Sequence, residues 1–456
     1  MVAMQDIYDY IDANRDKAIA DLQTFLRQPS ISAQKIGLEE CARLLRDQLL
    51  DHGISNTRIM PTDGGPEIVY SEITNQDARR TLLCYGHYDV QPPEPLDRWV
   101  SPPFAADIRD GVIIARGATD NKSGVHAFMK AADAFLNVRG DVPVNLKFVF
   151  EGEEEIGSPH FEPWVIDHTD MLACDASIGL DGGVHRTSGR AEIHLGIKAI
   201  LYVELRVKSH DEDFWSGRAQ LLKAQAAPWR LVHCLSTIFS PEGEIQIDGW
   251  YDDWEGPDDD DLYFIREEAK LFDRAELARQ FGVRGFPYET DEELLKAIHY
   301  GASANICGLS AGYTGEGSKT IVPSEAVAKL DFRCPPNLEP ADQLEKLRAH
   351  LEKHGFDDIE ILVHTARKNP YKSPVREAIS QATITAAETV FGEQPVVMGV
   401  SIQGIIKIHV PHPAVLSGFG AAENNLHAPN ENMPVDRYIQ GIKYAATIFD
   451  EFARHP

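Results

Sequence analysis

The order of apolar segments along the chain limits its fold more than any other feature of the sequence. Short apolar runs at 81–90, 144–150 and 176–181 end in polar residues, and a segment at 121–136 places apolar side chains at helical spacing. Apolar runs of this length, separated by a helix, are typical of buried strands in a parallel sheet. The sequence therefore predicts an α/β domain.

A different pattern occupies the middle of the chain. Apolar and polar residues alternate at 193–209 and 319–333, as they do in strands with one solvated face. Between these strands lies a helix candidate at 221–239, interrupted at Pro228. A solvated loop is predicted to carry Asp252, Asp253, Glu255 and the acidic run at 258–261, with calcium binding as a minor alternative. The alternation predicts an antiparallel sheet accompanied by helices.

This α+β pattern interrupts the α/β pattern instead of following it. From about residue 373 helical segments of the first kind return and continue to the C-terminus. The simplest organisation is one α/β domain formed by residues 1–188 and 370–456, with a smaller domain of residues 189–369 inserted in its middle.

The composition of this 456-residue chain excludes several classes of protein. Hydrophobic residues make up 43% and charged residues 25%, which is enough for a full core and excludes general disorder. The formal net charge of −27 argues against nucleic acids and anionic membrane surfaces as partners, and no apolar run is long enough to span a bilayer. The six cysteines are scattered without CxxC pairs, so we predict reduced thiols and a cytoplasmic location.

Five short segments hold acids and histidines in unusual density. They are GHYDVQP, RGATDNKSG, EGEEEIGS, LDGG and ENNLHAPNE, with the candidate residues His87, Asp89, Asp120, Glu153, Glu154, Glu155, Asp181 and His427. Taken alone, each acid has an ordinary interpretation as a turn residue, a helix cap or part of a solvated loop. Open α/β sheets, however, place ligand sites at the carboxyl ends of their strands, so we expect these segments to converge.

A set of histidines and carboxylates without cysteine favours zinc, with manganese or cobalt as alternatives. The three adjacent glutamates at 153–155 repel one another unless cations lie among them. The negative charges of Asp120, Glu155 and Asp181, together with one hydroxide, would balance two divalent cations lying about 3.5 Å apart. We therefore expect two divalent ions per chain.

In this order, the segments resemble the signature motifs of the M20 family of dinuclear zinc peptidases and amidohydrolases. The resemblance runs from about residue 87 to the C-terminus and includes GYTGEGSKTIVP at 312–323 and FRCPPN at 332–337, which are similar to lid segments of the carnosinase-like cytosolic dipeptidases. It implies a zinc-peptidase catalytic domain with a central mixed sheet flanked by helices. It also implies that the inserted domain, built on an antiparallel sheet, acts as a lid and joins two chains into a homodimer.

The resemblance assigns a role to each matching residue. The implied metal ligands are His87, Asp120, Glu155, Asp181 and His427, with Asp120 bridging the two ions. Asp89 would hold the His87 imidazole, and Glu154 would be the general base acting on a hydroxide between the metals. The peptide bond between Asp120 and Asn121 is expected to be cis.

Substrate contacts are implied in the inserted domain. Arg333 matches a position that binds the substrate carboxylate, and Thr320 and Asn305 are further candidates. The dipeptidases usually have DLHSG in the lid, where the histidine reaches the other subunit's active site, but this chain has DFWSG with Trp215 in that place. An indole N–H donates one hydrogen bond but carries no charge, so Trp215 favours an apolar or aromatic group on the substrate. A second departure is GVSIQG at 399–404, where the family has GGSIP.

The predicted activity is metal-dependent hydrolysis of the amide bond in a dipeptide or an N-acyl amino acid. The departures in the lid favour an alternative, a specialised amidase or deacylase acting on a non-peptide amide. A non-catalytic relative that serves as a binding protein is a third interpretation, against which the complete set of ligands and base argues.

Overall fold

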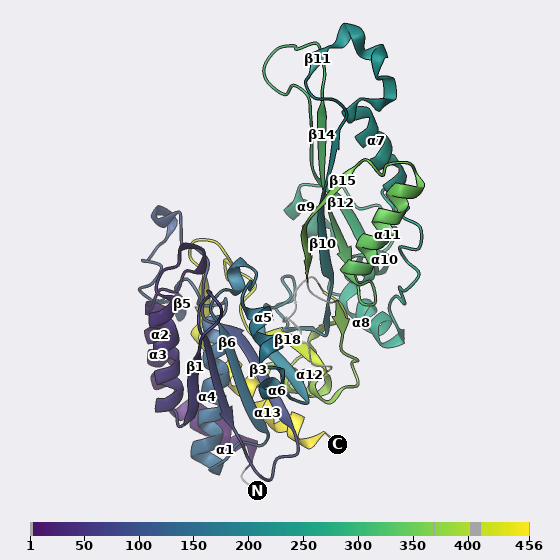
Figure 1. The fold of residues 1–456 in the computed structure, drawn as a ribbon. Helices are drawn as coiled ribbons and strands as arrows, with labels where there is room; N and C mark the ends of the chain where they lie inside the picture. The colour runs from purple at the N-terminus through teal and green to yellow at the C-terminus, as the bar shows by residue number, and fades with distance from the viewer. Residues whose placement is uncertain (1–2, 368–369, 402–411, 456) are drawn as a thin grey trace.

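The computed structural model describes residues 3–367, 370–401 and 412–455. Figure 1 shows a broad lower part, in which helices surround a large sheet, and a narrower upper part that extends away from it. Both ends of the chain lie in the lower part, and the upper part is formed by the middle of the sequence.

The large sheet has eight strands in the order β1-β2-β6-β3-β7-β18-β8-β17. Strands β6, β3, β7 and β18 run parallel, whereas β1–β2, β2–β6 and β18–β8 are antiparallel pairs. The predicted mixed sheet of an α/β fold is thus confirmed. The strands are β1 (Asn56–Met60), β2 (Ile68–Ile73), β3 (Thr81–His87), β6 (Asn145–Glu151), β7 (Ala176–Gly182), β8 (Glu192–His194), β17 (Val396–Met398) and β18 (Ala414–Gly418).

Helices cover both faces of this sheet, as alternate side chains of β3 show. Leu82 and Cys84 belong to a hydrophobic core shared with the buried helix α4 (Lys122–Arg139), whereas Leu83 and Tyr85 pack in a second core with α5 (Phe161–Asp167). Because both faces are closed, the carboxyl ends of the strands are where a ligand can approach. The other helices of this part are α1 (Met4–Ala13), α2 (Arg15–Arg27), α3 (Leu38–Asp51), α6 (Thr169–Leu172), α12 (Ala378–Phe391) and α13 (Val435–Arg454).

The upper part contains the antiparallel sheet that the alternating pattern predicts. Its strand order is β12-β14-β10-β15, and alternate residues of β14 are buried beneath α7 (Ala227–Ile238) and α11 (Pro340–Lys353). Edge strand β12 is mostly exposed. The strands are β10 (Ala199–Lys208), β12 (Ser303–Ala311), β14 (Glu325–Cys334) and β15 (Glu360–Arg367).

Two details predicted for this part are wrong. The helix predicted at 221–239 begins at Ala227, because Pro228 occupies the first turn, where the missing N–H of proline costs no hydrogen bond. The acidic run at 258–261 is not a loop, whereas Asp252, Asp253 and Glu255 before it do lie in an exposed loop as predicted. Asp258 caps α8 (Asp259–Ala269) by accepting a hydrogen bond from the backbone N–H of Asp261, and carboxylates in the first turn interact favourably with the helix dipole.

Short strands and α8 join the two parts. Strand β8, within the range predicted for the insertion, pairs with β17 and β18 of the large sheet, and α8 packs against β17. Strand β9 (Gly196–Ile197) pairs with β16 (Tyr371–Lys372) where the chain passes between the two parts.

The division into residues 1–188 with 370–456 and residues 189–369 stays a prediction, and position 369 lies outside the described residues. The remaining strands and α-helices are β4 (Asp107–Arg109), β5 (Val112–Ile114), β11 (Phe214–Trp215), β13 (Ile321–Val322), β19 (Asn432–Pro434), α9 (Arg274–Phe281) and α10 (Asp291–Tyr300).

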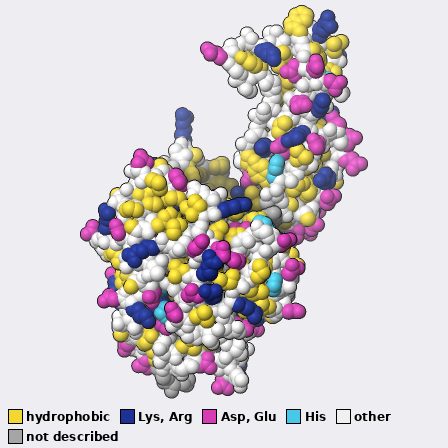
Figure 2. Space-filling view, turned by 60° about the vertical axis from the view of Figure 1, so that its left-hand side comes forward, with side chains coloured by type: hydrophobic (Ala, Val, Ile, Leu, Met, Phe, Trp, Pro, Cys, Tyr) yellow, Lys and Arg dark blue, Asp and Glu magenta, His cyan; other side chains and the backbone are white. Residues whose placement is uncertain are grey.

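The surface view in Figure 2 shows a hollow between the two parts. On the face drawn there, acidic and basic side chains are interspersed over both parts. None of the helices in the described ranges has both the length and the apolar character needed to cross a membrane.

Candidate metal centre

The predicted metal ligands meet at one edge of the large sheet. His87 is the last residue of β3, Asp181 lies near the end of β7, and Glu155 lies in the turn that follows β6. Because these three strands run parallel, their carboxyl ends share that edge. Asp120 lies just before α4, and His427 comes from the loop between β18 and β19.

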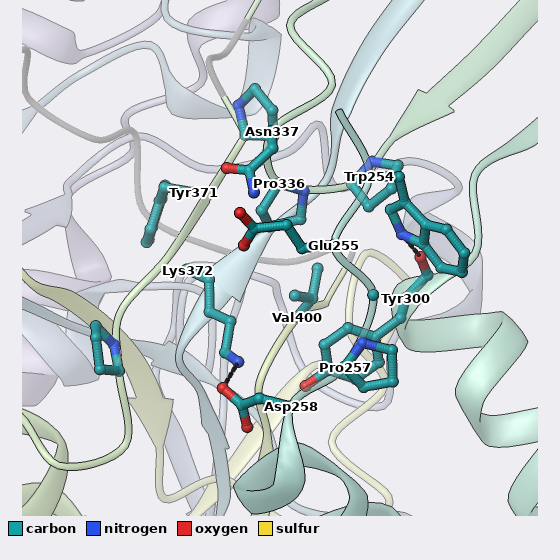
Figure 3. A pocket seen from close by; sticks show the side chains of 14 residues that line it. Trp254, Glu255, Pro257, Asp258, Tyr300, Pro336, Asn337, Tyr371, Lys372 and Val400 are labelled. Carbon is teal, nitrogen blue, oxygen red and sulfur yellow. Dashed lines mark hydrogen bonds and ion pairs between the residues drawn. The ribbon is translucent and has the colours of Figure 1, made fainter. Parts of the chain in front are cut away.

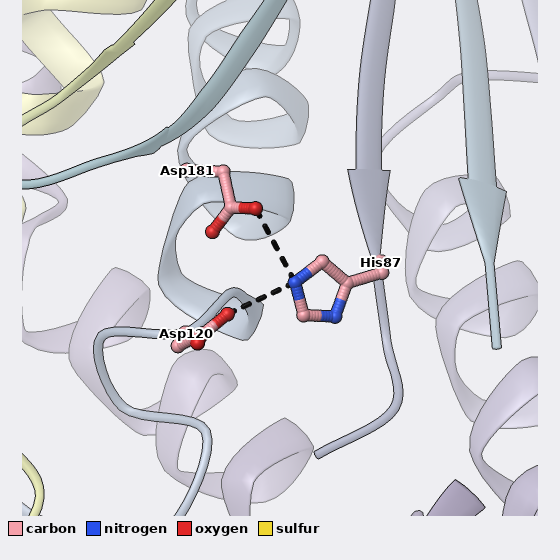
Figure 4. Close-up of side chains that lie close together, drawn as sticks. All are labelled: His87, Asp120 and Asp181. Carbon is pink, nitrogen blue, oxygen red and sulfur yellow. Dashed lines mark ion pairs between the residues drawn. The ribbon is translucent and has the colours of Figure 1, made fainter. Parts of the chain in front are cut away.

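Asp120 lies between the two histidines. One carboxylate oxygen, Oδ1, is 2.9 Å from His87 Nε2, and the other, Oδ2, is 2.9 Å from His427 Nε2. Asp181 Oδ2 is 3.4 Å from His87 Nε2 (Figure 4), and Glu155 Oε2 is 3.3 Å from His427 Nε2. Two groups of three candidate ligands, one with His87 and Asp181 and one with Glu155 and His427, therefore share Asp120. A carboxylate shared in this way suits a pair of cations.

The chemistry of these side chains fits divalent cations. Glu155 Oε1 is a buried atom that has no hydrogen-bond partner among the described residues, and the buried His87 Nε2 faces the carboxylates of Asp120 and Asp181. Buried polar atoms are almost always paired, so Glu155 Oε1 is available to bind a cation. Burial, together with the charge of Asp120, raises the pKa of Asp181 to about 8, and burial also raises the pKa of Glu155. A cation would favour the ionised form of both carboxylates.

The centre is buried on one side and open on the other. Burial opposes ionisation of Asp120, but hydrogen bonds with His427 and His87 outweigh it and lower the pKa of Asp120. The His87 side chain is fully buried, whereas that of His427 is 50% exposed. A substrate can therefore reach the centre from the His427 side.

Asp89 is placed to orient both His87 and the turn that carries Glu154. Its backbone carbonyl is 3.1 Å and its Oδ1 is 3.3 Å from His87 Nδ1. Its carboxylate also accepts hydrogen bonds from the backbone N–H groups of Glu154 and Glu155, at 3.1 and 3.2 Å. A metal-binding imidazole is commonly held through its second nitrogen in this way.

The peptide bond between Asp120 and Asn121 is cis. The Asn121 amide group donates a hydrogen bond to the carbonyl of Leu180 at 2.7 Å and accepts one from the His87 backbone N–H at 3.3 Å. Asn121 thereby ties the start of α4 to the ends of β3 and β7.

Sequence reasoning missed Glu431, which lies in the HAPNE segment. This residue is 1% exposed, and its carboxylate pairs with Arg116 at 2.7 Å. It also accepts hydrogen bonds from the backbone N–H groups of Gly117, Thr119 and Asp120 at 2.8–3.0 Å. Glu431 therefore fixes the backbone that carries the shared carboxylate. The motif was visible in the sequence, but the partners of Glu431 lie more than 300 positions earlier.

Removing the Arg116 guanidinium group, which pairs with Glu431, is expected to destabilise the fold. In Arg116→Met the buried carboxylate of Glu431 loses its guanidinium partner, and an unpaired buried charge costs about 3–5 kcal/mol. Chemical denaturation monitored by circular dichroism measures the loss. Arg279→Met, which removes an exposed ion pair with Glu276, is the control and should cost less than about 1 kcal/mol. Equal losses in the two variants would contradict the assignment.

The four candidate substrate contacts lie in the upper part. Trp215 is in β11 at the far end, with 65% of its surface exposed, and its neighbour Ser216 donates a backbone hydrogen bond to the carbonyl of Thr320. Asn305 is on β12, and Arg333, at the end of β14, has its Nε 3.4 Å from Asp331 Oδ2. Across the described ranges, no hydrogen bond or ion pair joins these four residues to the metal ligands. The structure thus brings the predicted metal ligands together but does not bring the substrate candidates to them.

Two histidine–carboxylate groups share one aspartate at the carboxyl edge of an α/β sheet, an arrangement that is typical of hydrolases that use two metal ions. The chain belongs to peptidase family M20/M25/M40, whose family model matches residues 83–451. It is therefore a hydrolytic peptidase of a metal-dependent family, as the motifs predict.

Relatives of known activity span the whole chain. The Beta-Ala-His dipeptidase of Homo sapiens is 27% identical over 99% of this chain and 93% of that protein. The Cys-Gly metallodipeptidase dug1 of Schizosaccharomyces pombe is 24% identical over 99% of both. The crystal structure of Sso-CP2, an M20 family metallo-carboxypeptidase from Sulfolobus solfataricus, has a TM-score of 0.83 at 35% identity and covers 96% of this chain and 99% of that one. The predicted dipeptidase branch is confirmed by these relatives.

Proposed function

We propose that this protein hydrolyses the peptide bond of a dipeptide, or the amide bond of an N-acyl amino acid, at a pair of divalent metal ions. The observation that carries the proposal is the sharing of Asp120 by two groups of three candidate ligands. The names of the relatives support small peptides as substrates, because two are dipeptidases and one is a metallo-carboxypeptidase.

Each residue of the centre has a role in this proposal. His87 and Asp181 would hold one ion, Glu155 and His427 the other, and Asp120 both. Zinc is the first choice, with manganese or cobalt as alternatives, because the set contains imidazoles and carboxylates but no thiolate. Two bound divalent cations acidify water and polarise a substrate carbonyl.

Glu154 would supply the general base. Its charge contributes to the raised pKa of Asp181, so it lies near the centre, yet it belongs to neither ligand group. Its carboxylate would accept a proton from the attacking water and deliver it to the amine that leaves. Asp89 would keep His87 and the Glu154 turn in position throughout.

We also propose that residues 189–369 form a lid and join two chains into a homodimer. Edge strand β12 pairs with β14 on one side only, and its Ile306 and Leu309 are 43% and 60% exposed. An open strand edge with exposed apolar side chains favours pairing with a second copy. In that dimer Trp215, far from the metal centre of its own chain, would approach the cleft of the other chain, and Arg333 would bind the substrate carboxylate.

All six cysteines are free, which supports a cytoplasmic location.

A substrate screen tests the proposed activity. Protein loaded with zinc, manganese or cobalt is offered dipeptides, N-acyl amino acids and aryl amides. About two ions per chain and turnover that a chelator abolishes are expected, with dipeptides or N-acyl amino acids preferred. A preference for aryl amides would instead support the specialised amidase that Trp215 favours. Two bound ions without turnover of any substrate would support a binding protein.

Substituting Trp215→His is expected to change selectivity. Without the indole, the preference for aromatic over small charged dipeptides, measured as a ratio of kcat/KM values, should fall by up to about tenfold. Trp229→His, which alters another exposed tryptophan of the upper part, is the control. An unchanged ratio in Trp215→His would show that this residue does not line the substrate site.

A further inference from the structure

A cavity of about 480 Å³ lies where the two parts meet (Figure 3). Trp254, Tyr300 and Asn337 of the upper part and Lys372 and Val400 of the lower part contribute to its walls. Sites for small molecules typically measure about 300–1,000 Å³ and are frequent at junctions of this kind. This cavity is therefore large enough to hold a small organic ligand.

The cavity lies on the side of the small sheet opposite Arg333, the predicted ligand of the substrate carboxylate. Trp254 packs against the core that contains Phe332 and Cys334, beneath the helices of the upper part. Arg333, between those two residues on β14, points to the other face, because successive side chains of a strand alternate. A ligand in this cavity would therefore not contact the side chain of Arg333.

Among the described residues, negative charge is in excess around the cavity. Lys372 Nζ is 2.7 Å from Asp258 Oδ2 and also contacts Asp261, so its single positive charge is shared by two carboxylates. The carboxylate of Glu255 extends into the space between Asn337 and Lys372 (Figure 3). The Glu255 side chain forms no hydrogen bond or ion pair with any other described residue. Among the described residues, Asp258 and Asp261 thus share Lys372, and the solvent-exposed carboxylate of Glu255 is left for a ligand.

The rest of the lining is aromatic or apolar. The indole N–H of Trp254 donates a hydrogen bond to the carbonyl of Tyr300 at 3.0 Å, which fixes the orientation of the ring. Tyr371, Pro257 and Pro336 add further flat, apolar surface. Aromatic faces next to an unpaired carboxylate are the groups with which proteins bind organic cations.

We propose that this junction cavity binds a small organic cation, a primary ammonium or guanidinium group on a flat apolar body. The charged group is held by Glu255, and the body packs against Trp254 and the neighbouring proline and tyrosine side chains. Because the walls belong to both parts, the bound cation contacts both. Neither the binding nor its measurement depends on the proposed peptidase activity.

Titration calorimetry of the metal-loaded full-length protein tests the site. The probes are 2-phenylethylamine, its neutral analogue 2-phenylethanol and the anion 3-phenylpropionate, which share an aromatic body and differ in charge. We expect saturable binding of the amine, and Glu255→Gln should weaken it by at least about tenfold, because a charge-assisted contact is lost. Glu242→Gln, a change to an exposed glutamate elsewhere in the upper part, should leave the affinity unchanged.

Two results would overturn the proposal. Equal affinities for the amine and the alcohol would show that the cavity does not select a cation. Amine binding of undiminished strength in Glu255→Gln would place the amine elsewhere, including the metal centre. If the metal-loaded native protein binds the amine but hydrolyses no amide substrate, that result would count against the proposed function alone.

Discussion

Substituting Glu154→Gln is expected to lower kcat by about 10²–10⁴-fold and to leave the metal content unchanged. Glutamine has nearly the same size as glutamate, but its amide cannot take a proton from water. Glu154 belongs to neither group of candidate ligands, so its substitution should not release a metal ion. Steady-state kinetics on the preferred substrate, with elemental analysis of the same samples, measures both quantities.

The neighbouring glutamate provides a matched control. Glu153 is buried and points to His160. Its carboxylate accepts a hydrogen bond from the backbone N–H of His160, and its Oε2 is 2.9 Å from His160 Nδ1. Glu153→Gln therefore changes an adjacent carboxylate that is directed away from the metal centre, and its effect on kcat should be far smaller. A Glu154→Gln variant that loses metal would identify Glu154 as a ligand, and one that keeps its full kcat would exclude it as the base.

The convergence of His87 and Asp181 could be predicted because it depends on local features of the chain. His87 and Asp181 follow apolar runs that read as parallel strands, and parallel strands end at a common edge. The approach of His427 to Asp120 depends on a contact between residues 307 positions apart. Periodicity does not reveal such a contact, and only the resemblance to a family pointed to it.

Val400 shows why other features could not be predicted. In the sequence it is merely a departure from GGSIP, but in the structure it is fully buried in a small core with Ile265, Leu295 and Tyr300. Those three residues belong to α8 and α10, so the valine side chain fills a core between these helices and the lower part. Gln403, the other departure in this segment, lies outside the described residues.

The sequence also gave no indication of how the upper part is attached. The acidic run that reads as a solvated loop instead caps α8, and its Asp258 and Asp261 contact Lys372 across the junction. Charge runs predict solvent exposure on average, but a cap and an ion pair require partners that are distant in sequence.

Substituting Asp120→Ala is expected to remove both metal ions, whereas Asp181→Ala or Glu155→Ala should leave about one. The reason is geometric, since Asp120 alone contributes to both groups of candidate ligands, while each of the other two carboxylates contributes to one. Turnover in Asp120→Ala should fall to the level of the chelator-treated protein. Elemental analysis after extensive dialysis gives the number of ions per chain.

Thermal unfolding gives an independent measurement of the same prediction. A ligand that binds only the folded protein stabilises it, by about 2.7 kcal/mol at a hundred times its dissociation constant. Added zinc should therefore raise the Tm of the native protein and, to a smaller extent, that of Glu155→Ala, but not that of Asp120→Ala. Asp110→Ala, which changes an exposed turn residue away from the centre, should respond like the native protein. If Asp120→Ala and Glu155→Ala lose the same number of ions, Asp120 does not bridge, and the two-ion centre on which the proposed hydrolysis rests would have to be replaced by a single-ion site.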